Sequence, residues 1–89
     1  MLEAKIRDVK KKGRSLRNLG LVTGTIKRKN GEIVPISMIG FKLETYLNRN
    51  GMNSVIPVNF NDEEVTVKIE RLQRHVLTHN VMNIDTFEV

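Results

Sequence analysis

One short stretch of the chain, LQRHVLTHNVMNIDTF (residues 72–87), contains both of its histidines and an aspartate ten residues after the first. His75 and His79 are four residues apart, and on a helix this spacing would place both imidazoles on one face as metal ligands. The residues between them, Val-Leu-Thr, favour a strand or a turn, and the chain has no cysteine to act as a third ligand. The sequence therefore predicts no metal site in this stretch.

His75 and Asp85 have the side chains of a general acid–base pair, which phosphodiester cleavage would use. Such chemistry also needs a nucleophile that is activated in a pocket, and the sequence offers no second sign of one. The six glycines form neither a P-loop nor a dinucleotide-binding pattern. We therefore predict a protein that is not an enzyme and that carries no cofactor.

Basic residues are concentrated at the start of the chain. Residues 1–29 contain ten Lys and Arg and two acidic residues, a net charge of +8, whereas residues 30–89 carry −3, so the first third supplies the whole excess of +5. A solvated basic arm that keeps the protein soluble would explain this distribution. A binding surface for nucleic acid would explain it equally well, because clustered cations release counterions when they neutralise phosphates.

The candidate phosphate-binding residues lie in and around this basic third. The stretch KKKGR (residues 10–14) is too charged to be buried and predicts an exposed loop, and RSLRNLG (residues 14–20) predicts one or two helical turns. Outward-facing cations on two neighbouring strands are expected to flank the loop. The candidates are Arg7, Lys10, Lys11, Lys12, Arg14, Arg17 and Lys27.

Two further polar residues, Asn83 and Asp85, would join the same face if the last strand lies beside the first. Amide and carboxylate groups among cations are suited to base edges rather than to phosphates, and aspartate accepts well from the amino group of cytosine. The four aromatic residues lie outside the basic third, so we expect them in the core or at its edge. They are Phe41, Tyr46, Phe60 and Phe87.

Apolar and polar residues alternate with the period of a β-strand over most of the chain. The expected strands cover residues 2–6, 21–28, 32–39, 54–60, 64–69 and about 81–89. Asn30-Gly31 predicts a hairpin turn, residues 61–63 predict a second one, and Pro35 is expected on an edge strand. Apolar residues at helical spacing between Phe41 and Leu47, with a stop at Asn50-Gly51, predict one short helix.

With 89 residues, of which 39% are apolar and 28% charged, the chain suits a single folded domain over residues 1–89. Six short strands without a repeating strand–helix–strand order predict a mainly β fold, a six-stranded antiparallel β-barrel with one or two short helices. The absence of cysteine suits a reducing compartment, and no apolar stretch is long enough for a signal or a membrane span. We therefore expect a cytoplasmic protein without membrane contact.

The segment EVTVKIERLQRHVLTHNVMNID (residues 64–85) resembles a signature of the bacterial large-subunit ribosomal protein number twenty-five family, in which a strand leads into V-Q-R-H-P and then H-[IV]-D-F. The matching positions are residues 72–75 and 83–85. Residues 15–28 are similar to a second family segment, R-L-R-x-x-G-x-V-P-[AG]-x-[IV]-Y-G. The family, which includes the N-terminal domain of the general stress protein, binds 5S ribosomal RNA, so the resemblance implies a six-stranded barrel that binds the internal loop of that RNA.

The resemblance also implies roles for individual positions. RNA contacts carry over to Arg7, Arg14, Arg17, Asp85 and the basic loop of residues 10–12, and the Gln73-Arg74-His75 corner adds Arg74 and His75 to the candidate RNA-binding residues. This corner is expected chiefly to hold the barrel and the RNA-facing loops in place. The chain departs from the family pattern at several positions: Ser15 for Arg, Thr23 for Pro, Lys27 for Tyr, Val76 for Pro, Asn83 for His and Thr86 for Phe, with Phe87 one place later.

These observations predict a ribosomal protein, or a stress-induced relative of one, that binds the internal loop and widened groove of 5S ribosomal RNA in the large ribosomal subunit. Off the ribosome we expect a monomer. The alternative is a non-ribosomal domain with the same barrel that binds another RNA or a protein partner. The two differ in salt dependence, because only a phosphate-binding surface loses affinity steeply as salt rises.

Overall fold

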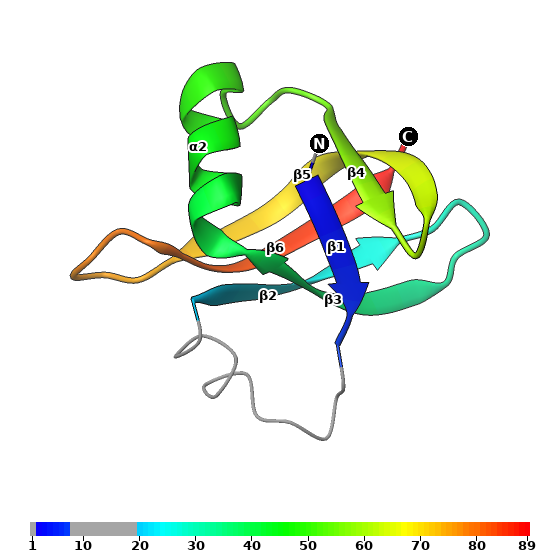
Figure 1. Cartoon of the computed structure of the whole chain (residues 1–89), viewed down its shortest axis with the longest axis horizontal. Helices are drawn as coiled ribbons and strands as arrows, with labels where there is room; N and C mark the ends of the chain where they lie inside the picture. Colours follow the sequence, from blue (N-terminus) through cyan, green and yellow to red (C-terminus); the bar gives the residue numbers. More distant parts are fainter. Residues whose placement is uncertain (1, 8–19) are drawn as a thin grey trace.

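The computed structural model describes residues 2–7 and 20–89, and the predicted basic loop and helical turns of residues 10–20 lie almost entirely outside this range. The described residues form a closed barrel with the strand order β1-β3-β2-β6-β5-β4 and one helix, α2 (Figure 1). The elements are β1 (Leu2–Ile6), β2 (Leu21–Lys27), β3 (Ile33–Ile39), α2 (Gly40–Asn50), β4 (Ile56–Phe60), β5 (Glu63–Arg74) and β6 (Val81–Glu88). The predicted six-stranded barrel with a short helix is confirmed.

The sheet is mixed, so the prediction of an antiparallel barrel is only partly right. The hairpin neighbours pair antiparallel, but β1 pairs with β4 and β2 pairs with β6 in parallel. The last strand does not lie beside the first, because β6 sits between β2 and β5, and β3 separates β1 from β2. A period of two identifies a strand but carries no information on the direction of a distant partner.

Inward-facing side chains of all six strands fill the barrel. Leu43 and Leu47 from α2 join the same core cluster. The largest fully buried side chains are Ile26, Ile36, Leu43, Ile56, Ile84, Val58 and Val67. No helix among the described residues is long and apolar enough to cross a membrane.

Both predicted hairpin turns are present. The amide of Arg28 donates to the carbonyl of Glu32 at 2.7 Å around Asn30-Gly31, and the turn between β4 and β5 consists of Asn61 and Asp62, both with positive φ. Pro35, by contrast, is not on an edge, because β3 is paired on both sides. Its carbonyl accepts from the amide of Arg7 at 2.9 Å, so its missing donor faces β1 directly beyond the last residue of that strand.

Two β-bulges shift the pairing of β5 with β6. Ile69 pairs with Thr86 but Arg71 pairs with Asp85, so Glu70 is the extra residue in β5. Gln73 pairs with Asn83 but Arg74 pairs with Val81, so Met82 is the extra residue in β6. A bulge reverses the alternation of the residues that follow it. Strand β5 therefore continues to Arg74, well past the predicted end at residue 69, with Leu72 inward and Arg71 and Gln73 outward.

Arg28, directly after β2, contacts residues of β4, β5 and β6. Its guanidinium donates to Glu88 at the end of β6 at 2.9 Å and to Glu63 at the start of β5 at 3.1 Å, and it lies 5.8 Å from the ring centre of Phe60. The hydrogen bond from Arg28, followed by that from the amide of Lys29, lowers the pKa of the Glu88 carboxyl from its ordinary value of 4.5. This network joins the β2–β3 hairpin to the end of β6 and the start of β5.

Replacing Glu88 by glutamine is expected to remove a contribution to the free energy of unfolding that depends on the Glu88 carboxyl being ionised. A carboxyl whose pKa is lowered by folding stabilises the protein above its unfolded pKa, and the contribution is lost as the pH falls through the folded value. Wild type should therefore exceed Glu88→Gln in urea midpoint at pH 6–7, and the difference should shrink below about pH 4.5. Circular dichroism during urea titration at several pH values measures this, with exposed Glu64→Gln as the matched control. A difference that persists unchanged to pH 3 would contradict the assignment.

Candidate nucleic-acid interface

The outer side of five consecutive strands, from β1 through β3, β2 and β6 to β5, forms one polar surface, which we call the polar face. Strand register arranges its outward side chains in rows across the sheet. The first row is Lys5, Ser37, Thr23, Asn83 and Gln73; the second is Arg7, Pro35, Thr25, Asp85 and Arg71; the third includes Lys27, Phe87 and Lys68. Cations thus stand at both sides of a central strip of hydroxyl, amide and carboxylate groups.

Hydrogen bonds across β2 and β6 hold the central strip in place. The Thr25 hydroxyl donates to Asp85 Oδ1 at 2.9 Å, and the Asn83 amide donates to the same oxygen at 3.3 Å. The Thr23 hydroxyl donates to Asn83 Oδ1 at 3.1 Å. Among the described residues no donor reaches Asp85 Oδ2. The strip therefore presents one preoriented carboxylate oxygen to an incoming hydrogen-bond donor.

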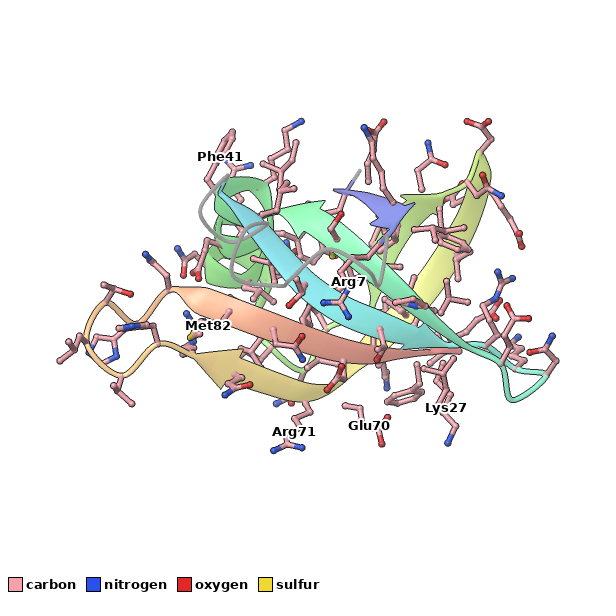
Figure 2. All side chains as sticks on the ribbon, turned by 90° about the horizontal axis from the view of Figure 1, so that it is seen from below. Arg7, Lys27, Phe41, Glu70, Arg71 and Met82 are labelled. Carbon is pink, nitrogen blue, oxygen red and sulfur yellow. The ribbon has the colours of Figure 1, made fainter. Side chains whose placement is uncertain are left out.

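Arg7 and Lys27 both belong to the polar face. The prediction that they lie on neighbouring strands was wrong, because β3 separates β1 from β2. Figure 2 shows Arg7, Arg71 and Lys27 on the same side of the barrel. The Nε of Arg7 is buried and finds no hydrogen-bond partner among the described residues. Asn83 and Asp85 reach this face through the pairing of β6 with β2, not through a pairing of β6 with β1.

Arg71 and Gln73 are members of the polar face that sequence reasoning missed. An uninterrupted alternation from Val65, Val67 and Ile69 would have turned both residues inward. The bulge at Glu70 reverses the phase and turns them outward, beside Asp85 and Asn83. A signal was present in the sequence, because the next apolar residue after Ile69 is Leu72, three positions on rather than two.

Arg74 joins the β5–β6 hairpin to α2, and His75 contacts residues of the hairpin turn itself. Arg74 Nη1 lies 3.2 Å from Glu44 Oε1 on α2 and 2.7 Å from the carbonyl oxygen of His79, and the amide of Val81 donates to the same Glu44 oxygen at 2.8 Å. His75 Nδ1 accepts from the amide of Leu77 at 3.1 Å. The Arg74 guanidinium thus bridges the hairpin and α2, and one imidazole nitrogen of His75 is used within the hairpin turn.

The alternative chemistries of this hairpin find no geometric support in residues 2–7 and 20–89. No group of His, Asp and Glu side chains that could hold a metal ion occurs within these ranges. His75 Nδ1 accepts from the amide of Leu77 and Asp85 Oδ1 accepts from the hydroxyl of Thr25, and no hydrogen bond joins the His75 and Asp85 side chains among the described residues. His79 lies exposed in the turn with a φ of 62°, and its contribution is its backbone carbonyl. Lys10, Lys11, Lys12, Arg14 and Arg17 lie outside the described residues.

The aromatic residues divide into two groups. Phe60 is buried and Tyr46 packs against the core while its hydroxyl donates to the carbonyl of Val55, so these two match the prediction. Phe41 is 71% exposed at the start of α2, and the prediction was wrong for it. Phe87 is half-buried and points outward, opposite Lys27, because the alternation of β6 directs Thr86 inward. The inward-facing residue that follows Asp85 in β6 is thus Thr86.

A small closed barrel with cations around a preoriented polar strip has the form of a nucleic-acid-binding protein. The sequence model of the Ribosomal L25p family matches residues 2–86, and the chain belongs to this family of ribosomal proteins. A comparison with curated protein sequences finds no match.

Proposed function

We propose that this protein binds the internal loop of 5S ribosomal RNA within the large ribosomal subunit and that the polar face is the binding surface. The observation that carries the proposal is the Asn83–Asp85 strip, held by two threonine hydroxyls and flanked by cations. A carboxylate repels phosphate, so its place amid cations suits a base edge that offers amino groups. Family membership supports the assignment to a ribosomal RNA.

Each part of the face has its own role in this proposal. Arg7, Lys27 and Arg71 contact phosphates, and arginine adds planar, bidentate contacts that lysine cannot form. Asn83 and Asp85 contact base edges. Arg74 and His75 act indirectly, because they hold the hairpin from which Gln73 projects. The proposal also assigns RNA contacts to the basic residues outside the described ranges, which are Lys10, Lys11, Lys12, Arg14 and Arg17.

A filter-binding titration tests the proposal. The probes are the 5S internal-loop segment and a random-sequence duplex of equal length, each measured over a range of salt concentrations. With roughly four to six phosphate contacts, log affinity should fall with log salt at a slope of about −0.7 to −0.9 per contact. The internal loop should bind more tightly than the duplex at every salt concentration.

Two results would contradict the proposal. Equal affinity for the internal loop and the random duplex would remove the 5S assignment while leaving general RNA binding. An absence of salt-dependent RNA binding would remove the RNA function altogether and would favour a protein partner, since an interface without phosphate contacts releases few counterions.

A further inference from the structure

One end of the polar face carries a shallow depression, and of its lining residues only Lys27 belongs to the contacts proposed above. It has a volume of about 360 Å³ and is lined by Lys27, Arg28, Glu70, Phe87 and Glu88. A volume of this size lies within the range of about 300–1,000 Å³ that small-ligand sites occupy. Figure 2 shows Glu70 and Lys27 close to one another at this end.

Phe87 supplies the apolar surface of the depression. Residues alternate along the end of β6, so Asp85 points outward, Thr86 is 3% exposed with its hydroxyl bound to the carbonyl of Thr25, and Phe87 again points outward. Its register partners are Lys27 on β2 and Lys68 on β5. An aromatic ring between two lysines is suited to a flat, apolar group attached to a phosphate, because the ring stacks and the cations bind the phosphate.

The two carboxylates of the depression differ in whether a described residue of the protein pairs with them. Glu88 is paired with Arg28 at 2.9 Å and accepts from the amide of Lys29 at 3.2 Å, so its charge is balanced within the protein. Glu70 is the bulged residue of β5, and no described residue forms a hydrogen bond or an ion pair with its side chain. A free carboxylate beside an aromatic ring repels phosphate at that point and accepts hydrogen bonds from amino groups.

We propose that this depression binds one unpaired nucleobase of the RNA, which stacks on Phe87 with its phosphate toward Lys27 and donates a hydrogen bond from its amino group to the Glu70 carboxylate. The inference rests on the proposed RNA-binding function and adds a specificity to it. Cytosine, adenine and guanine carry an exocyclic amino group and uracil does not. The depression therefore prefers an unpaired C, A or G to an unpaired U.

The experiment compares RNAs that differ at one nucleotide. The probes are the internal-loop RNA without a bulge and four versions with a single bulged C, A, G or U at the loop boundary, measured by fluorescence anisotropy. Wild type should bind the C, A and G bulges more tightly than the U bulge and the unbulged RNA. Phe87→Leu should lose roughly 5- to 150-fold on the bulged RNAs and little on the unbulged one, whereas Phe87→Trp should retain the preference.

Matched variants separate the base site from other effects. Phe41→Leu makes the same change at a 71% exposed ring that Figure 2 shows on a different side of the molecule, and it should behave as wild type. Glu70→Gln should narrow the difference between bulged C and bulged U, because an amide both donates and accepts. If Phe87→Leu proves unstable, Phe87→Trp and Glu70→Gln still decide the outcome.

The results distinguish this inference from the proposed function. Salt-dependent binding of the internal loop by wild type without any preference among the bulges would overturn the base site alone. A bulge preference that survives in Phe87→Leu would also overturn it. If the wild-type protein binds none of these RNAs, that result would contradict the proposed function and therefore also the base site.

Discussion

Gly24→Ala is expected to lower the free energy of unfolding by about 3 kcal/mol or more. Gly24 lies in the middle of β2, where the parallel pairing with β6 closes the barrel. A Cβ at this position would overlap the carbonyl oxygen of Ile84 and lie 2.9 Å from its carbonyl carbon. Because the obstacle is backbone, it cannot move aside as a flexible side chain would. Urea unfolding followed by circular dichroism measures the loss.

The size of this effect matters because a domain of this length has a total stability on the order of 5–10 kcal/mol. Gly31→Ala is the matched control, since nothing lies within 4 Å of its added Cβ and only its φ of +90° opposes the change. We expect this control to cost about 1–2 kcal/mol. A loss at position 24 no larger than that of the control would contradict the close approach of β2 to β6, because Gly24 has no positive φ that could account for a loss.

Arg71→Glu is expected to weaken binding to the 5S internal loop on the order of 10- to 100-fold. Arg71 is exposed on the polar face opposite Asp85, and the reversal removes a cation and adds a charge that repels phosphate. One lost phosphate contact should also flatten the salt slope by about 0.7–0.9. Fluorescence anisotropy at several salt concentrations measures both quantities.

Arg49→Glu is the control for this charge reversal, because it changes the net charge of the protein by the same amount. Arg49 is exposed in the last turn of α2, outside the polar face. We expect its effect on affinity to be several times smaller than that of Arg71→Glu. If the two variants lose affinity equally, the overall charge drives binding and the polar face is not its site.

Local patterns in the sequence were sufficient for most of the elements. Alternation along residues 21–28 and 32–39, with Asn30-Gly31 between them, predicted a hairpin, and the structure confirms it with strands over residues 21–27 and 33–39. Apolar spacing between Phe41 and Leu47 and the stop at Asn50-Gly51 predicted one short helix, which the structure has over residues 40–50. These predictions succeed because backbone propensity and one-sided burial act over a few neighbouring residues.

The members of the polar face could be predicted only in part from the sequence. Asn83, Asp85, Arg7 and Lys27 were identified by residue type and outward phase, and the structure brings all four to one side of the barrel. Arg71 was missed, because a strand with a bulge changes phase without any change in propensity. A bulge arises from how two strands fit each other, which neither strand encodes alone.

By itself, the sequence determined which segments are strands, where the chain turns and that its cations gather in the first third. Only the tertiary structure decided that β2 pairs in parallel with β6, that β3 separates β1 from β2 and that Phe87 and Arg71 face outward. Closing a barrel pairs segments some sixty residues apart, such as Thr25 with Asp85. Which distant strands pair depends on how all six strands bury their inner faces together. No local pattern in the sequence carries this information.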